Sequence, residues 1–154
     1  MPKFKDVEGR EWDVLVDIEA ARRCRKLLGF DLLGKDLGGT VTELVSDPVR
    51  LVDVLFVVLQ PDADKAGITD VQFGRAMRGD AIEAAERALL EALADFFPSQ
   101  QRDQMRRLLA TMEKATTAMR MEAEKAVAQV EAAIGQTSTE PPASPVSGLE
   151  KSEG

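Results

Sequence analysis

The sequence predicts a mainly α-helical protein, in which an N-terminal β-hairpin packs on a small helical bundle and is followed by a long C-terminal helix and a disordered tail. Aromatic residues make up only 5% of the chain and tyrosine is absent, so Leu, Val, Ala, Ile and Met must build the core, which favours helix packing. Apolar residues also recur at helical spacing through most of the chain, and the composition changes sharply near its end. We therefore expect a hairpin at 1–17, a helical core domain at 18–97, a long amphipathic helix at 98–134 and a disordered tail at 135–154.

The N-terminal segment is expected to form a β-hairpin over residues 4–17. The sequence VEGR at 7–10 supplies the turn, where Gly9 can adopt a positive φ. After the turn, the apolar residues Trp12, Val14 and Val16 alternate with residues that are mostly polar. Two strands alone are marginal in water, so the hairpin must lie against helices or join another sheet edge.

Helical spacing begins at Ile18. One apolar stripe is predicted along this first helix, with basic residues on its other side; its members are Ile18, Ala21, Cys24, Leu27 and Leu28. Gly29 follows and is expected to end the helix in the left-handed conformation.

A glycine-rich stretch over residues 30–39 predicts a loop in which Leu32 and Leu33 are buried. Residues 40–45 fit either one helical turn or a short strand.

The sequence Ser46-Asp47-Pro48 predicts the start of a helix, because Ser46 or Asp47 can cap it and proline suits the first helical position. The following residues, 49–59, are apolar on nearly every side after Asp53, which is typical of a helix surrounded by the rest of the fold. Because the run is rich in valine, a buried strand is the alternative. The cap and the length favour the helix.

Shorter elements are expected between residues 60 and 98. Gln60-Pro61 should end the central helix, residues 62–66 should lead to Gly67, and Thr69 should open a brief helix. An amphipathic helix is then predicted from Asp80 to the break at Phe97-Pro98, since the residue before proline is disfavoured in a helix. Its apolar positions are Ile82, Ala85, Leu89, Leu93 and Phe96.

The longest predicted helix starts at Pro98-Ser99, and its apolar residues recur in steps of three and four, as in a helix that requires a partner. Methionine is flexible and polarizable, which suits surfaces that fit varied apolar partners. For the first half of the helix, packing on the core and contact with a partner are both open, whereas partner contact is favoured for residues 115–134. The candidate partner-binding residues are Met105, Leu108, Met112, Met119, Ala126 and Val130.

Charge and hydropathy exclude several classes of protein. The net charge of −7 argues against nucleic-acid binding, which requires clustered Lys and Arg. The longest apolar run, at 54–59, is far too short to span a bilayer, and the N-terminus lacks the apolar segment of a signal peptide. A lone cysteine cannot form an internal disulfide. We therefore expect a cytoplasmic protein that binds neither membranes nor nucleic acid.

No catalytic, metal-binding or cofactor-binding residues are predicted. Histidine is absent, which removes the usual general base and the commonest metal ligand. Cys24 lies on the predicted apolar stripe, so we interpret it as a buried packing residue rather than a nucleophile. Asp62-Ala63-Asp64 begins like a calcium loop, but Ala66 stands at the fifth position and the later glutamate is missing.

Three segments together carry a resemblance to a known family. They are FKDVEGREWDVLVDIEAARRCRKLLGFDLL, then DPVRLVDVLFVVLQPDADKAGITDVQFGRAMRGDAIEAAERALLEALADFFP, then the charged helix after Pro98. Over residues 3–114 their order resembles tail assembly chaperones of long-tailed bacteriophages and prophages.

The resemblance implies a non-enzymatic protein that binds the long, helical tape measure protein and keeps it soluble until tail tube subunits polymerise around it. It also implies self-association, so a homo-oligomer is expected. The alternative is a structural virion protein, such as a tail-completion or connector subunit, which would remain in the finished particle.

Overall fold

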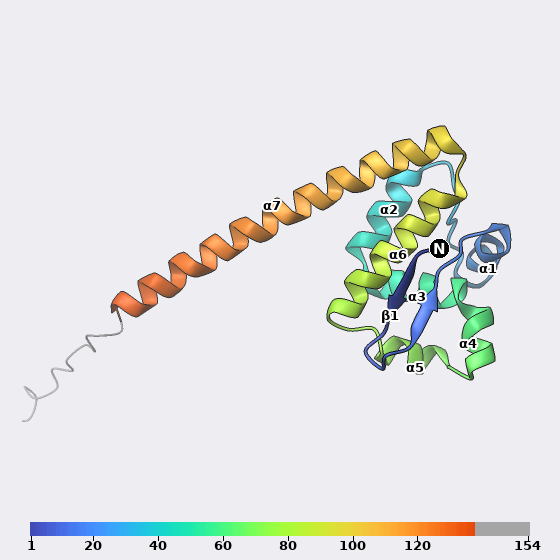
Figure 1. The fold of residues 1–154 in the computed structure, drawn as a ribbon, viewed down its shortest axis with the longest axis horizontal. Coiled ribbons are helices and arrows are strands. Elements are labelled where there is room, and N and C mark those ends of the chain that lie inside the picture. The colour runs from blue at the N-terminus through green and yellow to red at the C-terminus, as the bar shows by residue number, and fades with distance from the viewer. Residues whose placement is uncertain (138–154) are drawn as a thin grey trace, which may run out of the picture. The chain divides into compact units, whose positions relative to one another are not determined.

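The computed structural model describes residues 1–137, which form a two-stranded sheet and seven helices (Figure 1). These residues divide into a compact unit, Met1–Ala110, and a second unit that begins at Thr111. The predicted mainly helical fold with an N-terminal hairpin and a long last helix is confirmed. The elements are β1 (Lys3–Lys5), β2 (Glu11–Asp13), α1 (Ile18–Leu28), α2 (Leu37–Ser46), α3 (Pro48–Val58), α4 (Gln60–Ala66), α5 (Asp70–Arg75), α6 (Asp80–Phe96) and α7 (Ser99–Thr137).

Strands β1 and β2 pair antiparallel, with Phe4 opposite Trp12. The hairpin is shorter than the predicted 4–17. Val14 still donates its backbone N–H to the carbonyl of Pro2, although β2 itself ends at Asp13. The alternation predicted from the sequence persists without a partner strand, since Val14 and Val16 are buried and Leu15 is exposed.

Helix α3 lies at the centre of the compact unit, where it contacts α1, α2, α4, α5 and α6 (Figure 1). Asp47 caps its N-terminus by accepting from the backbone N–H groups of Val49 and Arg50, and Pro48 occupies the first turn. The helix prediction is therefore confirmed against the strand alternative. Its buried residues are Leu51, Val54, Leu55, Val57 and Val58.

Helix α1 packs against α3, and the predicted stripe is buried only in part: Cys24 is buried, and Ala21 and Leu28 are half-buried. The buried residues of α1 are Ala20 and Cys24, whereas Ile18 is 51% and Leu27 is 54% exposed. On the same helix, the guanidinium of Arg23 donates to the backbone carbonyls of Val57 and Val58 at the end of α3, both at 3.1 Å. The contact with α3 thus selects a face that includes a charged residue, because the last carbonyls of a helix need donors.

Helix α2 begins inside the predicted 30–39 loop. Asp36 caps it by accepting from the backbone N–H of Gly39 at 2.9 Å, so the glycines belong to the first helical turn. Residues 40–45 are helical, which settles the alternative of a short strand. Leu32 is fully buried as predicted, while Leu33 is only half-buried.

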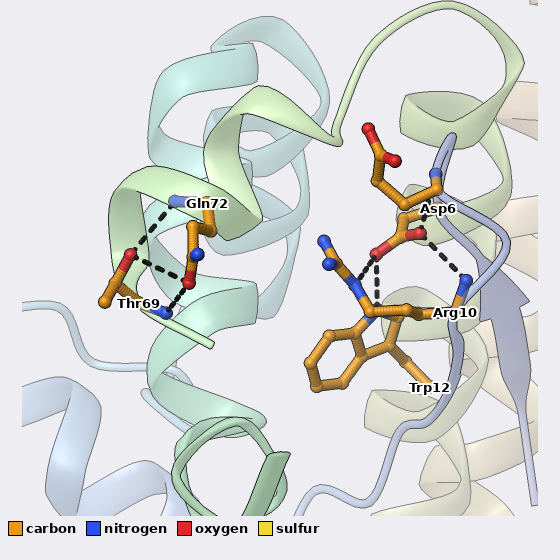
Figure 2. Close-up of polar contacts among 6 residues, drawn as sticks. Asp6, Arg10, Trp12, Thr69 and Gln72 are labelled. Atoms are coloured by element: carbon orange, nitrogen blue, oxygen red, sulfur yellow. Dashed lines mark hydrogen bonds and ion pairs between the residues drawn. The ribbon is translucent and has the colours of Figure 1, made fainter. Parts of the chain in front are cut away.

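Residues 62–66, predicted as a connecting segment, instead belong to helix α4, which ends at Gly67 with φ 70°. Proline at position 61 did not stop the chain from remaining helical, because it occupies the first turn of α4, where its missing N–H costs nothing. Thr69 then opens α5 with a capping box, in which the side chains of Thr69 and Gln72 each accept a backbone N–H of the other residue (Figure 2).

Helix α6 ends where predicted, with Phe97 in an extended conformation before Pro98. It covers α3 on one side and contacts β1. Helix α7 extends to Thr137, three residues beyond the predicted boundary at 134, and the remainder of the predicted disordered tail lies outside the described residues.

Candidate protein-binding surface

The first turns of α7 belong to the compact unit. Arg106 forms an ion pair with Asp95 at the end of α6 (3.0 Å), and Arg102 donates to the backbone carbonyl of Asp95 (3.3 Å). Met105, between the two arginines, is only 3% exposed. Of the two interpretations left open by the sequence, packing on the core therefore applies to Met105, which is not accessible to a partner.

The other candidate residues are half-buried or exposed along α7. Leu108 is 38% exposed, and Met112 is half-buried. Beyond Ala110, in the second unit, Met119 is 73% and Val130 is 57% exposed, and Ala126 is exposed as well. Four of the six predicted residues thus share the α7 segment 111–137, with Leu108 just before it.

Within that segment, residues at steps of four and three lie along one face of the helix, which we call the α7 stripe. The one polar member is Thr116, whose hydroxyl donates to the carbonyl of Met112 at 2.9 Å, so its hydrogen-bonding needs are met within the helix. The α7 stripe comprises Met112, Thr116, Met119, Ala123, Ala126 and Val130.

Three large apolar residues were not among the candidates but are exposed on the same helix. Val127 (55%) and Ile134 (59%) flank the α7 stripe and widen it. Met121 (56%) lies two residues after Met119, which turns it about 200° around the helix, to the opposite face. Helical angles computed from the sequence could have identified Val127 and Ile134 as part of the apolar face.

The buried carboxylate of Asp6 holds the hairpin turn. It accepts four hydrogen bonds, from the backbone N–H groups of Glu8 and Arg10, from Arg10 Nε (2.8 Å) and from Trp12 Nε1 (3.0 Å) (Figure 2). Burial opposes its ionisation, but the hydrogen bonds from Trp12 and Arg10 and the charge of Arg10 outweigh burial and lower the pKa of Asp6. Because both carboxylate oxygens of Asp6 accept hydrogen bonds from residues of the hairpin itself, we interpret this carboxylate as a structural group.

Cys24 is fully buried, as predicted for a packing residue. Burial raises the pKa of its thiol to about 11, and the nearby charge of Arg23 only partly opposes this. The thiolate required of a nucleophile is therefore scarce at neutral pH.

A small hollow of about 150 Å³ lies between the N-terminal strand region and α6. Asp95, the one titratable side chain among its lining residues, is already paired with Arg106. Across residues 1–137, no group of three or more Cys, Asp or Glu side chains is arranged to hold a metal ion, and none of the helices has the length and apolar character needed to cross a bilayer.

Comparisons of the chain with models of known protein families, with curated proteins and with solved structures find no match.

Proposed function

We propose that this protein is a non-enzymatic chaperone that binds a long helical client through the α7 stripe. The observation that carries the proposal is the exposure of large apolar side chains at helical spacing, with Met119 73% and Val130 57% exposed. An apolar face of this kind costs free energy in water, at roughly 25 cal/mol per Å² of apolar surface, unless other polypeptide covers it.

The chemistry of the α7 stripe suits a client that is itself an amphipathic helix. A straight helix presents a narrow apolar face, which pairs best with a matching helical face or a groove. Flexible methionines at 112 and 119 adapt to side chains of different shape, so one surface can accept different segments of a long helical client. Several copies along one long client would gain avidity, even where each contact is weak.

The client we propose is a phage tape measure protein, held in the cytoplasm of the host until the tail tube assembles around it. Support for this specific client comes from the resemblance of residues 3–114 to phage tail assembly chaperones. The net charge of −7 supports a solubilising role, because a highly charged chain keeps a bound apolar client from associating with others.

Co-expression with a tape measure protein from the same genome tests the proposal. The wild-type chain should move the client from the pellet to the supernatant and co-purify with it. Met119→Glu should abolish this effect, because it places a carboxylate in the apolar face. Met121→Glu is the matched control, since it adds the same charge two residues away on the opposite face. A client that is equally soluble alone, or that is rescued equally by both variants, would contradict the proposal.

A further inference from the structure

Helix α7 contains two stretches that differ in how far they are buried. In its first three turns one face is covered, since Met105 is buried and Arg102 and Leu109, three and four residues away, are half-buried. From Glu113 to Ile134, by contrast, every residue is exposed. We call residues 113–134 the outer segment of α7. Because most helices in proteins are stabilised by packing of an apolar face, burial contributes little to the stability of this outer segment.

A helix without such packing must first form a nucleus. Fixing the first hydrogen-bonded turn is unfavourable by a factor of roughly 10⁻³, whereas each further residue is added with an equilibrium constant of about 1–1.6 for good helix formers near 0 °C. Of the 22 residues in the outer segment, 17 are good helix formers, and neither glycine nor proline occurs between Pro98 and Gly135. This composition allows an existing helix to continue but does little to start one.

The first turns of α7 already contain a nucleus. The backbone N–H of Arg102 donates to the carbonyl of Pro98 at 2.8 Å, and the Arg102 guanidinium donates to the backbone carbonyl of Asp95 at 3.3 Å. One turn later, Arg106 forms its 3.0 Å ion pair with the Asp95 carboxylate, beside buried Met105. These contacts hold consecutive turns of α7 against the end of α6, so tertiary structure offsets the entropy of fixing the first turn.

We propose that the compact unit supplies the nucleus for the whole of α7, and that the outer segment is helical without any partner because it continues from that nucleus. The helix then grows outward one residue at a time beyond Ala110 and frays from its C-terminal end, where Gly135 weakens it. Helical order should therefore decline from Glu113 toward Ile134.

This inference goes beyond the proposed function and does not depend on it, because it concerns the chain alone. A segment that folds only on binding loses its conformational freedom when the partner arrives, which weakens the complex. An outer segment that is already helical avoids that loss, so the α7 stripe would meet a client as a preformed surface.

Hydrogen exchange of the full chain, followed by mass spectrometry of its peptides, tests the proposal with two matched variants. Ala115→Pro removes a helical hydrogen bond and clashes with the carbonyl of Thr111, which separates the outer segment from the nucleus. Ala132→Pro makes the same change at another exposed alanine, near the end of the helix. In both variants the compact unit should exchange as in the wild type.

In the wild type, amides of residues 116–127 should exchange at least about tenfold more slowly than in an unstructured chain, and more slowly near 116 than near 127. Ala115→Pro should bring all of them to within about threefold of the unstructured rate, because the separated segment must form its own nucleus. Ala132→Pro should leave them as in the wild type.

Three outcomes overturn the proposal. Wild-type protection of residues 116–127 in Ala115→Pro would show that the outer segment forms its own nucleus. Unprotected amides in the wild type would show that the helix does not continue from the compact unit. Protection that rises between about 1 and 50 µM protein would show that association, rather than the nucleus, maintains the helix. None of these outcomes bears on client binding, which the co-expression experiment measures separately.

Discussion

The indole Nε1 of Trp12 donates a 3.0 Å hydrogen bond to Oδ2 of Asp6, inside the hairpin turn. Both side chains are buried, and the ring of Trp12 in turn meets Phe73 of α5 edge to face, with ring centroids 5.3 Å apart. One carboxylate therefore closes the turn and fixes the aromatic residue through which the hairpin contacts the helices.

Replacing Asp6 with alanine should destabilise the protein strongly. The change leaves the indole N–H and the Arg10 guanidinium without their acceptor, which we expect to cost about 2–4 kcal/mol in the free energy of unfolding. Chemical denaturation monitored by Trp12 fluorescence measures this. Glu11→Ala, which removes only an exposed partner of Lys3, is the control and should leave the midpoint nearly unchanged.

The contribution of Asp6 should depend on pH. Because the folded protein lowers the pKa of Asp6, the stabilisation is fully present above the ordinary aspartate value of about 3.9 and is lost as pH falls through the lower folded pKa. The difference in unfolding free energy between wild type and Asp6→Asn should therefore be constant from pH 7 to about 5 and narrow below about 4. A difference that grows toward acid would show that the carboxyl is protonated in the folded state.

Two methionines of α7 should respond differently to truncation. Met105→Ala removes a side chain that is 3% exposed and should cost about 2–4 kcal/mol in the stability of the compact unit. Met119→Ala, at a position that is 73% exposed, should change the melting of that unit by less than about 0.5 kcal/mol. Thermal unfolding followed at Trp12 compares them. A large loss for Met119→Ala would mean that the α7 stripe is part of the core.

Mutation to alanine should change the stability of the protein in opposite directions at two glycines. Gly29 ends α1 with φ 63°, so Gly29→Ala should destabilise the protein by about 1 kcal/mol. Gly74 lies within α5 with open space where a Cβ would stand, so Gly74→Ala should stabilise it by about 0.5 kcal/mol. Urea titrations of the two variants measure the change in the unfolding midpoint. Changes of the same sign would contradict the left-handed conformation of Gly29 or the helical conformation of Gly74.

The proposed chaperone role and the alternative of a structural virion protein make different predictions about the finished particle. A chaperone leaves before the tail is complete, so mass spectrometry of purified particles from the same genome should lack peptides of this chain while detecting the tail tube protein. Stoichiometric amounts in the particle would favour a tail-completion or connector subunit.

Local signals in the sequence were enough to predict several boundaries. Asp47 and Pro48 start α3, Gly29 ends α1, and the Phe97-Pro98 pair separates α6 from α7, as the structure confirms. Each of these signals acts within a few residues, through a cap, a positive φ or a steric clash, so no distant part of the chain is needed to interpret it.

Tertiary structure decided which apolar residues are covered. The spacing in α1 placed Ile18 and Leu27 on a buried stripe with Cys24, yet Ile18 and Leu27 are exposed, and Ala20, which is not on that stripe, is buried. Likewise, the repeat in α7 runs unchanged through Met105 and Met119, and only the packing around Asp95, Arg102 and Arg106 buries the first. Periodicity determines that a helix has an apolar face, but burial depends on segments far away in the chain, whose positions the local sequence does not contain.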